Sequence, residues 1–194
     1  MNGVAGIFIY CRRQECRRAP RVPAFFCALL LILVLLPAGA GVAGEPGKGI
    51  LIEKVPFFVQ KDYQCGPASL AGVLNFWGLP ITPAEIAEEI FSSSARGTLG
   101  IDLALYAQKK GFQADFYRGN TEDLRKQIDS GRPVIVLVDY GFWVYEKGHF
   151  MVVIGYNDDG FIVNTGASRM KFIANDDFAG PWRKAGFWTL VISP

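Results

Sequence analysis

The period of the apolar residues changes near Gly131, and this change limits the fold more than any other feature of the sequence. Before it, Leu70, Val73, Leu74 and Trp77 follow the spacing i, i+3, i+4, i+7, which predicts a buried helix. After it, short segments rich in β-branched and aromatic residues predict strands; they are 133–140, 149–156, 161–165, 170–173 and 187–193. Helices followed by strands indicate an α+β domain with a mainly antiparallel sheet.

Helix boundaries and turns add detail to this order of elements. The first helix begins near Cys65 and ends at Gly78, and the second opens at a capping box that runs from Thr82 to Glu85. The sequence Asn-Asp-Asp-Gly at 157–160 predicts a hairpin turn. The remaining expected elements are helices at 100–110 and 121–130, a strand at 113–117 and a helical turn within 175–186.

Residues 24–43 carry no charge and are apolar or small, and five arginines precede them. This arrangement predicts a secretory signal with cleavage after Ala43. An uncut membrane anchor is the alternative, because about twenty apolar residues can span a bilayer. In both cases we expect residues 44–52 to be a linker and 53–194 to be an exported domain, in the periplasm or elsewhere outside the cytoplasm.

Charge and cysteine counts exclude several kinds of partner. Five of the 20 Lys and Arg and one of the 18 Asp and Glu precede residue 44, so the remainder carries a net charge of −2 and nothing indicates a nucleic-acid partner. Three of the four cysteines also precede residue 44, which leaves Cys65, and His149 is the only histidine. One cysteine and one histidine form neither a disulfide nor a zinc site, so we expect no cofactor. The sequence also lacks the G-x-x-x-x-G-K-[ST] motif of ATP-binding loops.

Cys65 and His149 together indicate nucleophilic catalysis. Cys65 is expected at the N-terminus of a helix, where unpaired N–H groups and the helix dipole favour a thiolate. His149 is expected at the start of a strand. Each residue alone has a structural interpretation, as a buried small hydrophobe and as a polar strand-edge residue. A single cysteine at a helix start and a single histidine at a strand start fit a nucleophile–base pair that is adjacent in space.

The segments around these two residues resemble a known family. "VPFFVQKDYQCGPASLAGVLNFWG" (55–78) and "GHFMVVIGYNDDGFIVNTG" (148–166) are similar to the bacteriocin-processing, double-glycine-leader cysteine peptidases and their stand-alone exported relatives, within the papain-like superfamily. The resemblance spans about residues 53–194. It implies a papain-like fold, Cys65 as nucleophile, His149 as general base, and a peptide or protein substrate.

The oxyanion-hole glutamine of that family is shifted in this chain. It usually lies six residues before the cysteine, where this chain has Val59. Gln60 is the nearest match and Gln64 is the fallback. A side-chain amide suits the task because it donates to the charge that appears on the carbonyl oxygen.

The residue that orients the histidine also departs from the family. An aspartate usually follows about sixteen residues after the histidine, where this chain has Thr165. If the 157–160 turn has a two- or four-residue loop, even-numbered positions share the face of His149. This favours Asn164 as the residue that orients the ring, as asparagine does in papain-like proteases, and a structural role for Asn164 is the alternative.

The sequence thus predicts an exported cysteine peptidase that works through a Cys65 acyl-enzyme. The alternatives are a catalytically degenerate peptide-binding module and a transpeptidase or acyltransferase with the same Cys–His pair. Four aromatic residues precede His149; they are expected to be core or sheet-edge cover, with a wall of a peptide cleft as the alternative: Tyr140, Phe142, Trp143 and Tyr145.

Overall fold

The computed structural model describes residues 49–60, 63–92, 97–141 and 147–194, and residues 44–194 form one compact unit. The predicted leader and most of the predicted linker lie outside the described residues. None of the helices in the described ranges combines the length and the hydropathy that a membrane crossing needs.

The helical half of the domain follows the sequence pattern closely. Three helices come first, α2 (Cys65–Phe76), α3 (Pro83–Ile90) and α4 (Gly100–Lys109). The predicted capping box at the start of α3 is confirmed, since Glu85 N–H donates to Thr82 Oγ1 and the Glu85 carboxylate accepts from Thr82 N–H. Strand β2 (Gln113–Arg118) and helix α5 (Thr121–Asp129) complete this half as predicted.

The second half supplies most of one antiparallel sheet. Its strands are β3 (Val134–Asp139), β4 (Gly148–Tyr156), β5 (Gly160–Thr165), β6 (Ser168–Ala174) and β7 (Trp188–Ser193). Their order, with the earlier strand, is β2-β7-β3-β4-β5-β6, and every pair formed by the described residues is antiparallel. The predicted α+β class is confirmed.

Two elements differ from the sequence prediction. The segment that we expected to be a linker contains β1 (Ile50–Leu51), which pairs with the C-terminal end of β4. The predicted helical turn near the C-terminus is a complete helix, α6 (Asn175–Lys184), although Pro181 lies inside it.

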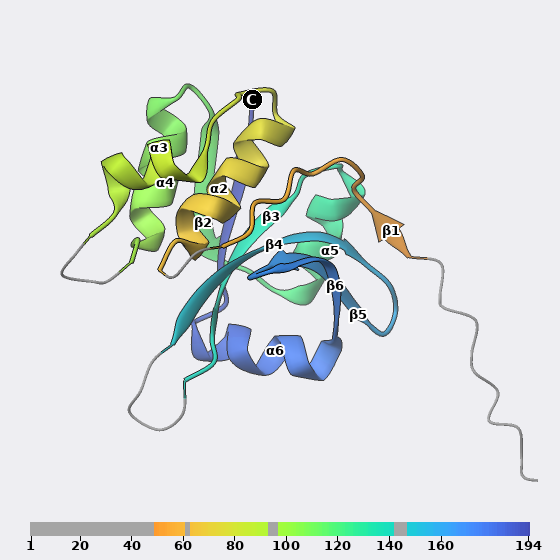
Figure 1. Ribbon diagram of the computed structural model, residues 1–194. Helices are drawn as coiled ribbons and strands as arrows, with labels where there is room; N and C mark the ends of the chain where they lie inside the picture. The colour runs from red at the N-terminus through yellow and green to blue at the C-terminus, as the bar shows by residue number, and fades with distance from the viewer. Residues whose placement is uncertain (1–48, 61–62, 93–96, 142–146) are drawn as a thin grey trace, which may run out of the picture. The chain divides into compact units, whose positions relative to one another are not determined.

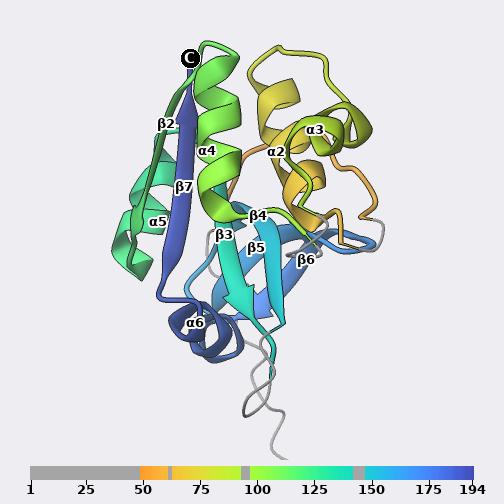
Figure 2. The same ribbon diagram turned by 90° about the vertical axis from the view of Figure 1, so that its left-hand side faces the viewer.

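The sheet carries helices on both faces (Figures 1 and 2). On one face, α2 and α4 pack against Phe150, Val152 and Ile154 of β4, together with residues of β7. On the other face, α5 and α6 cover Met151 and Val153 of β4 and the facing residues of β5. Strand β4 is therefore buried on both sides along most of its length, which fixes the position of His149 near its start.

A β-bulge in β4 sets which residues of β5 face His149. The hairpin turn is as predicted, with Tyr156 opposite Phe161 and a hydrogen bond from Asn157 N–H to the Gly160 carbonyl. The register then shifts between Val153 and Gly155. Beyond the shift Val152 lies opposite Asn164, so the odd-numbered residues of β5 share the face of His149.

The chain before α2 explains why this bulge forms. Ile52 N–H donates to the carbonyl of Ile154, the extra residue of the bulge, at 2.7 Å. Gly155 allows β1 to approach, because a Cβ at that position would lie 2.6 Å from the Ile50 carbonyl oxygen. The incoming segment and a glycine therefore hold the shifted register.

Candidate active site

Cys65 is the first residue of α2, as predicted, and its side chain is partly exposed. No side chain caps this helix end, and its first turn contains no acidic residue. The first intrahelical bond runs from Ala68 N–H to the Gln64 carbonyl, and Pro67 has no N–H to place. Within the described residues the N–H groups of Cys65 and Gly66 make no bond inside the helix, and the positive end of the helix dipole lies beside the sulfur.

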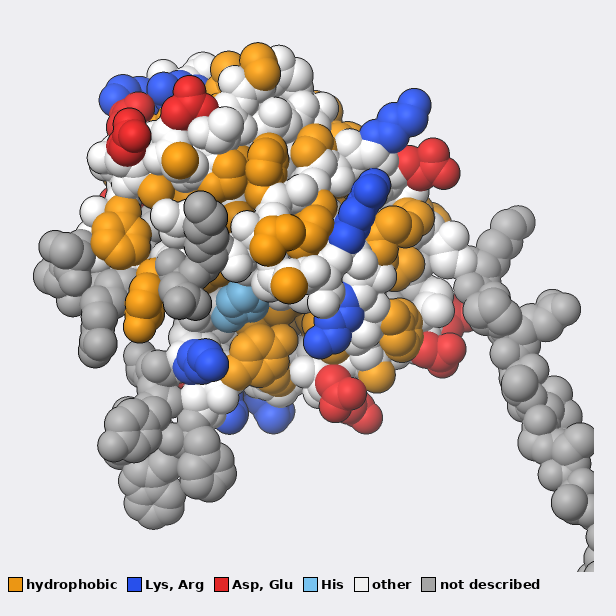
Figure 3. Space-filling view, in the orientation of Figure 1, with side chains coloured by type: hydrophobic (Ala, Val, Ile, Leu, Met, Phe, Trp, Pro, Cys, Tyr) orange, Lys and Arg blue, Asp and Glu red, His pale blue; other side chains and the backbone are white. Residues whose placement is uncertain are grey.

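His149 is the second residue of β4, opposite Val138 of β3, and it is partly buried. Its ring nitrogen Nε2 lies 2.7 Å from Thr165 Oγ1. This contact leaves Nδ1 as the nitrogen that could accept a proton from a thiol. Figure 3 shows the ring of this single histidine at the surface, between hydrophobic patches.

The prediction that Asn164 orients His149 is wrong. Asn164 is 4% exposed and faces the opposite side of the sheet, with Val152. Its Oδ1 accepts a hydrogen bond from Met170 N–H at 3.0 Å, and its Nδ2 is buried without a hydrogen-bond partner among the residues that the structure describes. The reason is the bulge in β4, which reverses the parity that the turn alone would give and brings Thr165 to the histidine.

Gln60 joins the segments that carry the predicted catalytic residues. Its backbone N–H donates to the Gly166 carbonyl, and its Oε1 accepts from Gly166 N–H, both at 2.9 Å. Its Nε2 lies 3.4 Å from the Phe150 carbonyl and 3.5 Å from Ser69 Oγ of α2. These last two distances exceed the usual hydrogen-bond length, so the amide N–H groups are weakly engaged.

The other two glutamine positions differ from Gln60. Val59, at the family's usual position, is 65% exposed and apolar. Gln64 precedes α2 at the N-cap position, where its side chain does not cap the helix. Among the three, Gln60 is the residue whose amide reaches between α2 and β4.

Cys65 and His149 come from elements that pack against each other beside Gly66. A Cβ at Gly66 would lie 3.4 Å from the Phe150 ring and 3.1 Å from Thr98 Cβ, so the glycine allows α2 to approach β4 next to His149. Within the described residues no hydrogen bond joins the Cys65 sulfur to the His149 ring. The hydroxyl of Thr98, which the sequence analysis did not consider, is buried beside Gly66 and has no hydrogen-bond partner within the described part of the chain.

The surroundings of His149 favour its neutral form. Burial, and to a lesser degree the nearby Lys147 ammonium, lower the pKa of His149. No carboxylate contacts its ring among the described residues. A lowered pKa keeps the imidazole unprotonated and able to act as a base at neutral pH.

Asp139 closes the base of the loop before His149. Its Oδ1 accepts from Lys147 N–H at 2.8 Å and from Gly141 N–H at 2.7 Å, and these bonds lower the pKa of Asp139. Tyr140 follows it, half exposed, with its ring 6.3 Å from the His149 ring. Tyr140 is therefore an exposed ring near His149 and not a core residue; the other three aromatic residues of this group lie outside the described residues.

Comparison with known protein families identifies the family of the chain. A family model with the description Peptidase_C39 like family matches residues 52–189. The chain belongs to this family. Two relatives are uncharacterised proteins: one from Methanothermobacter thermautotrophicus is 32% identical over 106 residues, which are 55% of this chain and 67% of the relative. One from Methanothermobacter marburgensis is 34% identical over 111 residues, 57% and 70% of the two chains.

Solved structures of C39 peptidases share the fold. A C39-like peptidase from Bacillus anthracis gives a TM-score of 0.63 at 17% identity, over 76% of this chain and 98% of that one. The peptidase domain of the Streptococcus ABC transporter ComA gives 0.61 at 24% identity, over 73% and 99%. A double glycine motif protease from an AMS/PCAT transporter, in complex with the leader peptide, gives 0.59 at 22% identity, over 77% and 97%. The predicted papain-like C39 fold is therefore confirmed.

Proposed function

We propose that this C39-like protein is a cysteine peptidase that hydrolyses peptide bonds, with Cys65 as nucleophile and His149 as general base. The observation that carries the proposal is the contact between His149 Nε2 and Thr165 Oγ1, which leaves Nδ1 as the base nitrogen on a strand that packs against the Cys65 helix. The family relationship supports a peptidase, and a C39 neighbour that binds a leader peptide supports a peptide substrate.

The reaction would proceed through a thioester. Thr165 accepts the Nε2–H of His149, so the lone pair of Nδ1 takes the thiol proton of Cys65 as the sulfur attacks the carbonyl carbon. The protonated ring gives this proton to the leaving amine, and the acyl group remains on sulfur. Water then attacks the thioester, loses a proton to His149 and releases the carboxylic acid, and the sulfur regains its proton.

Charge develops on the carbonyl oxygen during both attacks. The Cys65 backbone N–H at the uncapped start of α2 is one donor for it. Gln60 is the second donor in this proposal, because its Nε2 makes only long contacts at 3.4 and 3.5 Å and can turn toward an oxyanion. The location is part of the proposal: the basic and apolar leader exports the domain, which then acts outside the cytoplasm.

A thiol-directed inhibitor tests the proposal. The purified full chain is incubated with a peptidyl vinyl sulfone, and mass spectrometry locates the adduct. We expect one adduct, on Cys65, and none in the Cys65→Ala chain. We also expect no adduct when the chain is unfolded at low pH and treated with the inhibitor at that same pH. An intact fold with an unmodified Cys65 would refute a reactive thiol.

A peptide-binding module without catalysis is the second candidate, and two observations favour it. Thr165 supplies a neutral hydroxyl where the related peptidases have a carboxylate, and the described residues show no hydrogen bond between Cys65 and His149. Hydrolysis of a mixed peptide library that disappears in Cys65→Ala would eliminate this candidate. If added amines capture the acyl group in place of water, the same thioester serves acyl transfer.

A further inference from the structure

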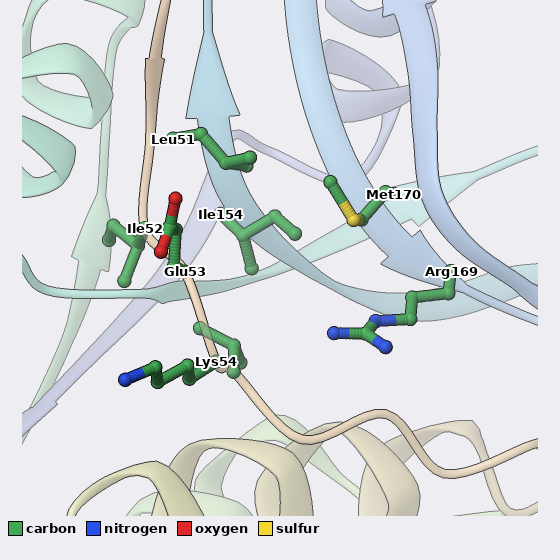
Figure 4. A pocket seen from close by; sticks show the side chains of 8 residues that line it. Leu51, Ile52, Glu53, Lys54, Ile154, Arg169 and Met170 are labelled. Carbon is green, nitrogen blue, oxygen red and sulfur yellow. The ribbon is translucent and has the colours of Figure 1, made fainter.

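A cavity of about 300 Å³ lies on the sheet away from the residues of the proposed reaction (Figure 4). We call it the arm pocket, because one wall is the arm, residues 51–55, that leads from β1 toward α2. Ile154 of β4 and Arg169 and Met170 of β6 form the rest of its lining. Neither Cys65, His149, Gln60 nor Thr165 lines it, so the proposed chemistry does not explain it.

The lining is mostly apolar. Leu51, Ile52, Val55, Ile154 and Met170 supply aliphatic or thioether surface. The volume is at the lower end of the range for small-molecule sites, about 300–1,000 Å³, so it suits one large side chain better than a cofactor. An apolar side chain is therefore the part of a ligand that this cavity can bury.

Two residues of the lining adopt a backbone conformation that side chains disfavour. Lys54 has φ 62° and Met170 has φ 52°. Such a conformation costs on the order of 1–3 kcal/mol in a residue other than glycine, and it is most often retained at functional sites. At Met170 the conformation is held by the bond from its N–H to Asn164 Oδ1.

The charges around the pocket are not neutralised. Arg169 and Lys54 have no ion pair or side-chain hydrogen bond within the described part of the chain, and neither has Glu53. Figure 4 shows the Arg169 guanidinium extending from β6 toward the arm, whereas the Lys54 ammonium points away from it. Arg169 is thus the group placed to meet a carboxylate at the rim.

Apolar surface continues from the pocket onto its surroundings. Met170 is 46% exposed and Phe172, two residues on along the edge strand β6, is 47% exposed. Ile50 of β1 is exposed as well. Figure 3 shows hydrophobic patches with Lys or Arg side chains between them over the region of β1 and β6. A binding partner would cover both the apolar and the positive groups.

We propose that the arm pocket binds an apolar side chain of an extended, acidic peptide, whose carboxylate pairs with Arg169. The proposal rests on the proposed function for the choice of a peptide as ligand. Phe150, which lies beside Gly66, and Ile154, which lines the pocket, are on the same face of β4. Four residues of strand extend about 13 Å, a length that four or five extended residues span. A peptide held at Cys65 can therefore reach the pocket, and the pocket selects its sequence.

Binding of dye-labelled octapeptides to the full-length Cys65→Ala chain tests this proposal by fluorescence anisotropy. Three libraries contain one Leu in a background of Gly, Ser and Ala, with one Glu, one Gln or one Lys in addition. We expect the Glu library to bind about fivefold more tightly than the Gln library, the upper end of what an exposed ion pair supplies. The Lys library is expected to bind more weakly than both.

Two variants locate the effect. Arg169→Glu is expected to reverse the order of the Glu and Lys libraries, while Arg183→Glu, the same charge change on the exposed face of α6, keeps it. Met170→Gly removes an apolar wall of the pocket, and glycine adopts φ 52° without strain, so the fold should be retained. When the Leu of the Glu library is replaced by Ala, the unaltered pocket should bind the Leu peptides more tightly than the Ala peptides, and Met170→Gly should reduce this ratio about fivefold.

Failure of this proposal and failure of the proposed function give different results. Equal binding of the Glu and Lys libraries, or an Arg169→Glu chain that behaves like Arg183→Glu, overturns the arm pocket as an acidic-peptide site. Because the Cys65→Ala chain cannot turn over substrate, charge-dependent binding establishes the pocket even if the unaltered chain hydrolyses nothing. If the unaltered chain hydrolyses peptides without any preference for acidic ones, the proposed peptidase function stands and the proposed acidic-peptide site at the arm pocket is refuted.

Discussion

Replacing Thr165 with valine isolates the hydroxyl that contacts His149. Valine keeps the shape of threonine, so the change removes the 2.7 Å contact between Nε2 and Oγ1 with little effect on packing. A hydrogen bond between neutral groups contributes about 0.5–1.5 kcal/mol and one to a charged group about 1.5–3 kcal/mol. Because the ring is charged only in the transition state, about 1.4 kcal/mol of transition-state stabilisation is lost, and kcat/KM should fall about tenfold.

The assay is steady-state hydrolysis of a fluorogenic peptide by the unaltered chain and the variant. We expect the loss in kcat with KM little changed, because the ring does not bind substrate in its ground state. Thr165→Ser retains the hydroxyl and serves as the matched control, with an activity within about threefold of the unaltered chain. Thermal unfolding of each protein shows whether the fold is preserved.

Full activity of Thr165→Val, with Cys65→Ala inactive, would refute the role of Thr165. A Thr165→Ser chain as impaired as Thr165→Val would also contradict it, because serine supplies the same acceptor. If Asn164→Ala instead gave the selective loss of kcat, the ring would be oriented from the opposite face of the sheet. That outcome would contradict the register described for β4 and β5.

Four further expectations follow from the same contacts. Burial and Lys147 lower the pKa of His149, so in a pH profile of kcat/KM the midpoint of the acid limb should lie below the ordinary histidine value of about 6.5. The free energy of unfolding should fall as the pH drops from about 6.5 through the lowered pKa. An acid limb with its midpoint above pH 7 would contradict this. Thr165→Asp should move that limb to higher pH, because a carboxylate stabilises the imidazolium; an unmoved limb would show that residue 165 does not contact the ring. Gln60→Glu removes the amide donor but keeps an acceptor for Gly166, so kcat should fall about 100-fold while the melting temperature is retained; equal losses of both would indicate a structural role only. Thr82→Ala removes the cap of α3 and should lower the melting temperature by about 2–4 °C without changing kcat, and calorimetry together with the peptide assay checks both.

The elements that the sequence predicted well are those specified by local signals. The capping box at Thr82, the apolar spacing from Leu70 to Trp77 and the turn at 157–160 each depend on residues close together in the chain. Helix α2 and the 157–160 hairpin formed as expected for that reason. Strand β1 has only two residues and pairs with residues more than a hundred positions later, so no local pattern could indicate it.

The orienting residue could not be predicted because it depends on a distant contact. The pairing expected from the turn is present at its base, where Tyr156 lies opposite Phe161. One extra residue at Ile154 then reversed the faces of β5, and that residue is held by Ile52, far away in sequence. A single register shift moves every side chain of a strand to the other face. Gly155, which lets β1 approach, is the one local sign of the bulge.

A hydroxyl as the orienting group agrees with the electrostatics of the site. A buried imidazolium without a carboxylate is costly, so the environment of His149 and the identity of residue 165 both favour a neutral ring. A neutral ring with its proton on Nε2 can accept the thiol proton at Nδ1, and this requires no preformed ion pair with Cys65. In the proposed mechanism the imidazolium charge then appears only as the substrate is attacked, together with the negative charge on the carbonyl oxygen, which the Cys65 N–H and the Gln60 amide stabilise. The proposed peptidase would therefore act by general-base catalysis, and we expect its activity to depend on the His149–Thr165 contact, which a β-bulge creates.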